Sequence, residues 1–85
     1  MRVKVLFFAN LREQLGTAAE EIELPAGVTT VAALRSFLVQ KNPSWKNSLA
    51  ESKLVRVAVN RDMAAAGATL KAGDEVAFFP PVTGG

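Results

Sequence analysis

The chain ends in Glu75-Val76-Ala77-Phe78-Phe79-Pro80-Pro81-Val82-Thr83-Gly84-Gly85. Its residues 75–79 alternate as a half-buried strand does, with Val76 and Phe78 expected to point inward. The two prolines that follow fix φ near −65° and have no N–H to donate to a sheet. We therefore predict a last strand that ends at Phe79, followed by a stiff stalk and a short tail.

The tail, residues 82–85, is expected to be flexible and to lie outside a domain formed by residues 1–81. Because Gly84 and Gly85 have no Cβ, they fit where a side chain would clash. When extended, Val82 to Gly85 would reach roughly 13 Å, at about 3.3 Å per residue. A frayed end is the alternative for any diglycine, but the stalk before it favours a presented tip. We predict that the α-carboxylate of Gly85 is the working group.

Composition restricts the function classes. The 85 residues suffice for one small domain, and 49% hydrophobic with 21% charged residues is typical of a soluble globular protein. The ten Lys and Arg are scattered, which argues against a nucleic-acid partner in spite of the net charge of +2. Without Cys or His there is no thiol chemistry, no imidazole base and no His or Cys metal ligand. No signal peptide or membrane span is evident, so we expect a cytoplasmic protein without a membrane partner.

The first quarter of the chain predicts two strands around a small helix. Residues 1–9 alternate, which places one set of side chains on the core face. Asn10 is expected to cap a helix over Leu11–Leu15 that stops at Gly16. Residues 20–24 alternate acidic and aliphatic side chains, and Pro25-Ala26-Gly27 then turns the chain. The inward side chains predicted from these segments are Val3, Val5, Phe7, Leu11, Leu15, Ile22 and Leu24.

The main helix is predicted over about Val31–Lys41, capped by Thr29 or Thr30. Val31, Leu34 and Leu38 form its core stripe with Phe37 beside them, whereas Arg35 and Gln40 lie outside. Asn42-Pro43 ends the helix. The stretch 44–52 is expected to be polar and irregular, with Trp45 as a lid on the core edge.

A third strand is predicted over Leu54–Asn60, turned by Arg61-Asp62, with Met63 just beyond it. Val55, Val57 and Val59 share one face of this strand, and Arg56, Ala58 and Asn60 share the other. Gly73-Asp74 is a further turn before the last strand. One helix and a mostly antiparallel sheet, with the first and last strands parallel, make an α+β domain of the ubiquitin-like β-grasp type: a mixed sheet packed against one main helix.

The sheet face opposite the main helix is expected to be a docking surface. It carries Leu6, Phe8, Met63 and Phe79 beside the root of the tail. A loop of the same chain could cover them, but little chain is left to do so. An exposed apolar patch of this kind marks an interface.

At this point the residues resemble a known family. The eleven-residue end, preceded by Gly73-Asp74, and the opening Val5-Leu6-Phe7-Phe8-Ala9 followed by Leu11-Arg12-Glu13 are similar to the sulfur-carrier small subunit of molybdopterin synthase. The resemblance implies the β-grasp fold and a role as the small subunit of a sulfurtransferase. This subunit supplies a sulfur-bearing terminus and no catalytic side chains, within a heterotetramer of two small and two large subunits.

The resemblance also implies a reaction cycle and its partners. An ATP-dependent activating enzyme adenylates the Gly85 carboxylate, and a sulfur donor converts it to a thiocarboxylate. The loaded tail enters the large subunit and gives its sulfur to cyclic pyranopterin monophosphate. ATP is used by the activating enzyme, and no cofactor is bound permanently. The catalytic positions implied are Gly84 and Gly85, no metal site is expected, and the partner-binding positions implied are Phe8, Met63, Phe79, Pro80, Pro81, Val82 and Thr83.

Three rival functions remain open. A thiamine-pathway sulfur carrier also has a β-grasp fold and a diglycine end, but usually lacks the Phe-Phe-Pro-Pro stalk. A ubiquitin-like protein modifier would use the same activation step and join Gly85 to lysines of its targets. An adaptor or RNA-binding module is suggested only by the sequence pI of about 9.4, and its binding would fall steeply with salt.

Overall fold

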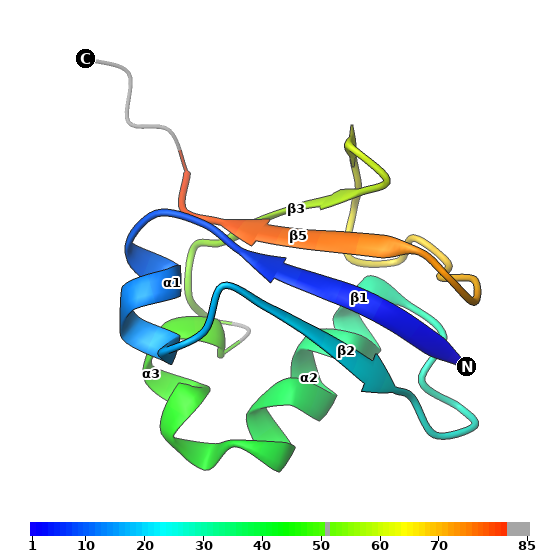
Figure 1. Cartoon of the computed structure of the whole chain (residues 1–85), viewed down its shortest axis with the longest axis horizontal. Helices are drawn as coiled ribbons and strands as arrows, with labels where there is room; N and C mark the ends of the chain where they lie inside the picture. Colours follow the sequence, from blue (N-terminus) through cyan, green and yellow to red (C-terminus); the bar gives the residue numbers. More distant parts are fainter. Residues whose placement is uncertain (51, 82–85) are drawn as a thin grey trace.

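One mixed sheet with the strand order β2-β1-β5-β3-β4 dominates the computed structural model, which describes residues 1–50 and 52–81 (Figure 1). β1 is antiparallel to β2 and parallel to β5, and β3 is antiparallel to β5 and β4. The parallel pair at the centre requires the crossover that the main helix provides. The ubiquitin-like β-grasp prediction is therefore confirmed. The strands are β1 (Arg2–Phe7), β2 (Ala19–Glu23), β3 (Arg56–Val59), β4 (Asp62–Met63) and β5 (Glu75–Phe79).

The helices pack on one side of this sheet. They are α1 (Asn10–Leu15), α2 (Val31–Lys41), the 3₁₀-helix η1 (Pro43–Trp45) and α3 (Lys46–Leu49). Figure 1 shows α2 and α3 below the sheet, and no described helix lies over its other side. Thr30 is the N-cap of α2. Its backbone is extended, and its hydroxyl oxygen accepts a hydrogen bond from the Ala33 N–H at 3.1 Å.

The core lies between β1, β5 and α2. Phe7 stacks on Phe78 with ring centroids 5.9 Å apart and meets the edge of Trp45 at 5.3 Å. Trp45 is buried and closes the core at this end, as predicted. The inward side chains predicted for the strands and for α1 and α2 are buried: Val3, Val5, Phe7, Leu11, Leu15, Ile22, Leu24, Val31, Leu34, Leu38, Val57, Val76 and Phe78.

Leu34→Ala should destabilise the domain by about 2–4 kcal/mol, because Leu34 is fully buried and its loss leaves a cavity. Loss on this scale is a large share of the stability of so small a domain. The free energy of unfolding from urea titration measures the effect. Leu54→Ala is the matched control, since Leu54 is 80% exposed and should cost little. Equal midpoints for Leu34→Ala and wild type would show that Leu34 is not a core residue.

The predicted cap of α1 is wrong by one residue. Asn10 is the first helical residue, and Ala9 precedes the helix with φ 55° and no side-chain cap. β1 also ends at Phe7 rather than at Ala9. The chain turns sharply from the strand into the helix, and the Ala9 carbonyl accepts a hydrogen bond from the Arg12 N–H at 3.1 Å. The predicted stop at Gly16 is confirmed, with φ 77°.

The stretch after α2 is more regular than predicted. Two short helices, η1 and α3, replace the expected irregular segment, and Leu49 is fully buried. Arg35, predicted to lie outside, holds this stretch to α2. Its Nε donates to the Leu49 carbonyl at 2.7 Å, and its Nη2 donates to the carbonyls of Ala50 and Lys53 at 2.7 and 2.6 Å. A planar guanidinium with several donors suits a row of helix-end carbonyls.

The turn after β3 lies one residue earlier than the predicted Arg61-Asp62. Asn60 and Arg61 form it, with φ of 50° and 73°, and the missed strand β4 begins at Asp62. Two adjacent residues in the left-handed region match the hairpin turn whose twist suits the flanking strands. β3 is also shorter than the predicted Leu54–Asn60.

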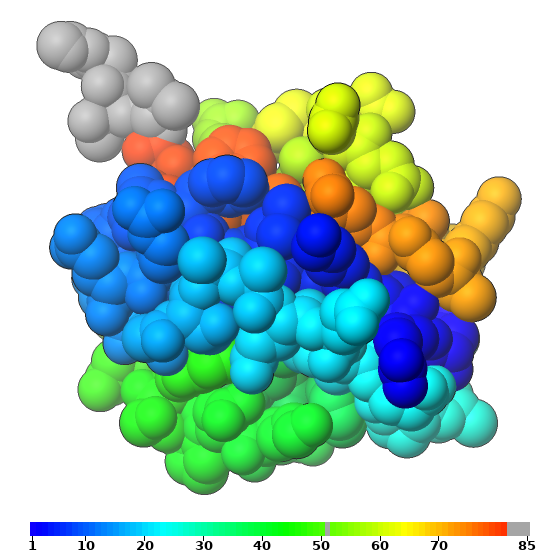
Figure 2. Space-filling model, viewed as in Figure 1, coloured from blue at the N-terminus to red at the C-terminus, as the bar shows by residue number. Residues whose placement is uncertain are grey.

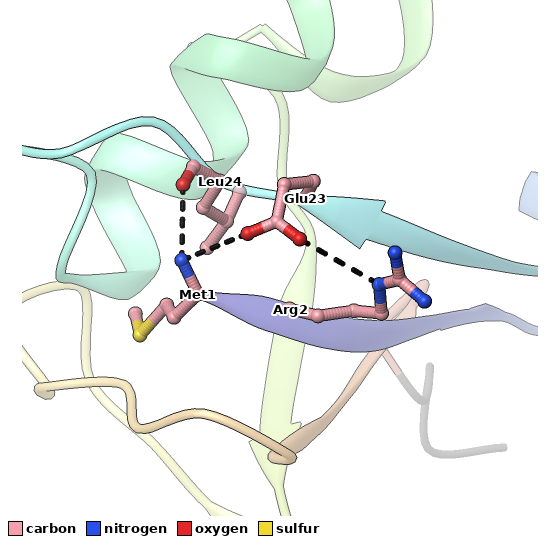
Figure 3. A network of polar contacts seen from close by, with 4 residues as sticks. All are labelled: Met1, Arg2, Glu23 and Leu24. Atoms are coloured by element: carbon pink, nitrogen blue, oxygen red, sulfur yellow. Dashed lines mark hydrogen bonds and ion pairs between the residues drawn. The ribbon is translucent and has the colours of Figure 1, made fainter.

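An ion pair ties the amino terminus to β2 (Figure 3). The Met1 ammonium lies 3.0 Å from the Glu23 carboxylate and donates to the Leu24 carbonyl at 3.2 Å. Arg2 Nε lies 3.7 Å from the other Glu23 oxygen. The hydrogen bond from the ammonium and its charge, with a smaller contribution from Arg2, lower the pKa of Glu23. The carboxylate form is thus favoured in the folded chain.

Stability should depend on pH through Glu23. A carboxyl group with a lowered folded-state pKa stabilises the fold above its unfolded pKa, and this is lost as pH falls through the folded value. The urea midpoint of wild type should therefore exceed that of Glu23→Gln slightly at pH 7, and the two should converge in acid. Glu23 is exposed, so added salt should shrink the difference. A difference that is constant from neutral to acidic pH would contradict this assignment.

Candidate docking face and stalk

A row of apolar side chains crosses the sheet on the face opposite α2. The cross-strand register aligns Ala19, Leu6, Ala77, Ala58 and Met63, one from each strand in sheet order. Since side chains alternate along each strand, all five point away from the main core. Three are alanines and Leu6 is half-buried, so the centre of the row is low and flat. Figure 2 shows β1, β5 and the β3–β4 hairpin exposed side by side along the upper side of the molecule.

Ala58 is outward, as predicted, yet it is 8% exposed. It is flanked in register by Ala77 and Met63, and a methyl group is too short to emerge from between its neighbours. Met63, at the end of the row, is 60% exposed. The row therefore has a buried centre and a prominent, flexible side chain at one end, which suits a surface that adapts to a partner.

Two aromatic residues stand between this row and the stalk. Phe8 is 47% exposed, and its N–H donates to the Phe78 carbonyl at 3.1 Å. Phe79 of β5 is half-buried and lies opposite Arg56 of the neighbouring strand β3. The structure thus brings Phe8, Met63 and Phe79 to one face, as predicted. Their role in binding a partner stays a prediction.

Polar residues border the other end of the face. Lys4 lies between Glu21 and Glu75 in the register. Asn60 extends this border, because its side chain accepts a hydrogen bond from the Glu75 N–H at 3.0 Å and donates to Asp74 at 2.9 Å. Towards the stalk the face carries Phe8 and Phe79 beside the exposed Arg56, and away from the stalk it carries the charges of Lys4, Glu21 and Glu75. This asymmetry would orient a docked protein.

The stalk leaves from the middle of the sheet. β5 is hydrogen-bonded to β1 on one side and to β3 on the other, so its end is held by both neighbours. Pro80 and Pro81 follow β5 and are half-buried. Val82, Thr83, Gly84 and Gly85, which include the predicted catalytic positions and part of the predicted partner-binding set, lie outside the described residues.

One exposed apolar residue was missed. Leu54, two residues before β3, is 80% exposed, and only Phe8 and Met63 join it as exposed large hydrophobic residues in the described ranges. Alternation could have placed it on the side of Arg56 and Ala58, but the prediction assigned it no face. We add Leu54 to the positions to be tested in docking.

Residues 5–85 match the ThiS family. The chain belongs to this family. The match begins within β1 and runs to Gly85, so it spans the sheet, the stalk and the tail. No helix in the described part of this ThiS-family chain is long and apolar enough to cross a bilayer.

Relatives of this ThiS-family chain are alike in sequence and in fold. It is 47% identical over 83 residues to the molybdopterin synthase sulfur carrier subunit of Escherichia coli (strain K12), covering 98% of this chain and 99% of the relative. The crystal structure of SAMP1 from Haloferax volcanii superposes with a TM-score of 0.79 at 30% identity over the full length of both chains. A complex of subunits 1 and 2 of molybdopterin-converting factor from Helicobacter pylori contains a chain with a TM-score of 0.68 at 26% identity, also over the full length of both.

Proposed function

We propose that this chain is the sulfur carrier and small subunit of molybdopterin synthase. The observation that carries the proposal is the position of β5. This strand is the centre of the sheet, contributes Ala77 to the apolar row, and leads through Pro80 and Pro81 towards Gly85. One element thus links a docking face to a chain end. The 47% identity to the Escherichia coli sulfur carrier subunit supports the choice of reaction.

The proposed cycle acts on the Gly85 carboxylate. A carboxylate is a poor electrophile because its charge repels nucleophiles and its oxygen is a poor leaving group. An activating enzyme uses ATP to attach AMP to the carboxylate oxygen, with loss of pyrophosphate. A sulfur donor then displaces AMP from the acyl carbon and leaves a thiocarboxylate. Inside the large subunit, this sulfur is transferred to cyclic pyranopterin monophosphate, which restores the carboxylate.

The chain itself supplies presentation rather than acid–base chemistry. It contains no Cys or His, so in this proposal proton transfer belongs to the partners. Gly84 and Gly85 keep bulk away from the acyl carbon, which must be reached inside a cleft. Pro80 and Pro81 lead the chain from the end of β5 towards that carbon. Positioning of this kind converts binding energy into rate.

The proposed docking uses Phe8, Met63 and Phe79 against the large subunit. The Helicobacter pylori complex shows a related fold bound to a second subunit, which supports such a partner here. A heterotetramer of two small and two large subunits is part of the proposal. The activating enzyme must reach the same tail, so we expect it to use the same face at another stage of the cycle.

Intact mass spectrometry tests the proposal. The purified chain is incubated with ATP, an activating enzyme and a sulfur donor, and with each component left out in turn. The complete mixture should raise the mass by the difference between one sulfur and one oxygen atom, and the product should support molybdopterin formation with the large subunit. A mass that stays constant in the complete mixture, while a known carrier is loaded in parallel, would contradict the proposal.

A protein modifier is the second candidate, since the full-length match to SAMP1 is with a small archaeal modifier protein. Both functions share the activation of Gly85. They differ in the group that attacks the activated Gly85 carbonyl. This group is a lysine amine of the target for a modifier and the sulfur of a donor for a carrier. Isopeptide-linked adducts in a lysate, identified by peptide mass spectrometry, would favour the modifier, and a thiocarboxylate without adducts would favour the carrier.

A further inference from the structure

A groove of about 490 Å³ separates α2 from the outer edge of β3. Its floor is aliphatic, with Val31, Val39, Leu49, Val55 and Val57 among the lining residues. This volume lies within the range of sites that hold a ligand or a few side chains. The groove lies at the edge of the sheet beside α2 and meets the docking face at Met63, which is one of its lining residues.

The edge of the sheet just before β3 is open along this groove. β4 has two residues and pairs only with Ala58 and Val59. The Ala64 N–H donates to the Val57 carbonyl at 3.0 Å, so the chain that follows β4 still covers the edge at Val57. Val55 precedes β3, and among the described residues no backbone hydrogen bond outside the sheet ladder uses its N–H or its carbonyl. An open edge of this kind pairs readily with another extended chain.

The rim of the groove is positive. Lys46, exposed at the start of α3, and Arg35 of α2 belong to the lining. Arg35 is held in place by its bonds to the Leu49, Ala50 and Lys53 carbonyls. No Asp or Glu is among the described residues of the lining. Carboxylates on an incoming chain would therefore meet complementary charge.

We propose that this groove binds an extended peptide segment of a partner protein by strand addition. The backbone of the segment pairs with Val55 ahead of β3, and its alternate aliphatic side chains enter the groove between β3 and α2. Its flanking carboxylates face Lys46 at the rim. This is the recognition mode in which main-chain hydrogen bonds give affinity and side-chain pockets give specificity. The site goes beyond the proposed sulfur carriage and would bind with an unloaded tail.

The probe is the peptide acetyl-Asp-Glu-Val-Ile-Val-Glu-Asp-amide, whose acids at both ends serve either strand direction. Titration into ¹⁵N-labelled protein should shift the amide signals of Val55 and Val57 and those of α2 residues along the groove. Hydrogen exchange at Val55 should slow by about tenfold at nine-tenths occupancy, because only the unbound fraction exchanges. The same peptide with Lys for each acid should bind at least about tenfold more weakly.

Two protein variants test the site. Lys46→Glu should weaken binding by about tenfold or more, and Ser36→Trp, at an exposed lining position on α2, should block the groove. Arg12→Glu, an equal charge reversal on the exposed side of α1, should bind as wild type does. Their ¹⁵N spectra confirm folding. Equal binding of the acidic and Lys peptides, full binding by both groove variants, or shifts confined to the outer face at Leu6 and Phe79 would each overturn the proposal.

Discussion

One residue added after Gly85 should abolish sulfur loading of an otherwise folded chain. In the proposed function the reacting carbon is the last one, and each added residue moves it by about 3.3 Å. A misplacement of even 1 Å can cost about a hundredfold in rate, so loading should fall by more than about a hundredfold. Intact mass after incubation with ATP, activating enzyme and sulfur donor measures this loss. Deletion of Gly85 should have the same effect, because the new carboxylate falls short of the site.

The same residue added before Met1 is the matched control. β1 and β5 run parallel, so Met1 and the stalk lie at opposite ends of the sheet (Figure 1). This extension should disturb only the ammonium's contacts with Glu23 and Leu24, and loading should proceed as in wild type. If a C-terminally extended chain, shown by mass to be unprocessed, supported molybdopterin synthesis as well as wild type, the terminal-carboxylate mechanism would be wrong.

Arginine at Phe8 should abolish binding to the large subunit while the fold survives. Phe8 is 47% exposed on the outer face, so the free chain can hydrate the new charge. In a complex the same charge would be buried without a partner. Hot-spot losses of about 2–4 kcal/mol, or roughly 30- to 1,000-fold in Kd, are expected. Met63→Arg should act alike, and Phe79→Arg should act more strongly on folding, since Phe79 is half-buried.

Asn47→Arg controls for added charge, because Asn47 is exposed on α3, on the helix side of the sheet, and does not line the groove beside α2. Co-purification with the large subunit and isothermal titration report binding, and thermal melting reports folding. Phe8→Arg that still co-purifies like wild type would remove the outer face from the docking proposal. A collapse of the melting temperature would instead show that Phe8 supports the core.

Regular elements with strong local signals were predictable from the sequence. β5 and α2 have the predicted bounds, Glu75–Phe79 and Val31–Lys41. In both cases the periodic apolar pattern is closed by residues that end it, the two prolines after Phe79 and Asn42-Pro43 after α2. Thr30 adds an N-cap, because its hydroxyl oxygen accepts a hydrogen bond from the Ala33 N–H. Pattern and boundary signals agree at these elements, and the prediction therefore holds to the residue.

Elements fixed by tertiary contacts were not predictable. η1 and α3 are too short to be stable alone. They form where Leu49 is buried and where Arg35 donates hydrogen bonds to the Leu49 and Ala50 carbonyls. Likewise, the turn at Asn60 and Arg61 places a long cation at φ 73°, where Gly is usual. Asn60 is bonded to Asp74 and Glu75, which helps hold that turn.

The candidate site also has one part that the sequence predicts and one part that it does not. Alternation along single strands placed Phe8 and Phe79 on the outer face, and the structure confirms that position. The continuous row from Ala19 to Met63 depends on the register between strands, which alternation within one strand does not specify. The groove beside Val55 and Val57 depends on where β4 stops, and β4 itself was missed. Residues 82–85 remain predicted from their chemistry alone.

The parallel pairing of β1 and β5 also decides how the domain responds to mechanical force. A pull on the stalk, resisted at Met1, acts along the axes of both strands in opposite directions. All the hydrogen bonds between them are then loaded together in shear, whereas a hairpin pulled at its open end would unzip one bond at a time. Forced unfolding is governed by the unfolding rate, and this geometry makes that step slow. In the proposed function, the body would thus stay intact while a partner enzyme pulls on the stalk.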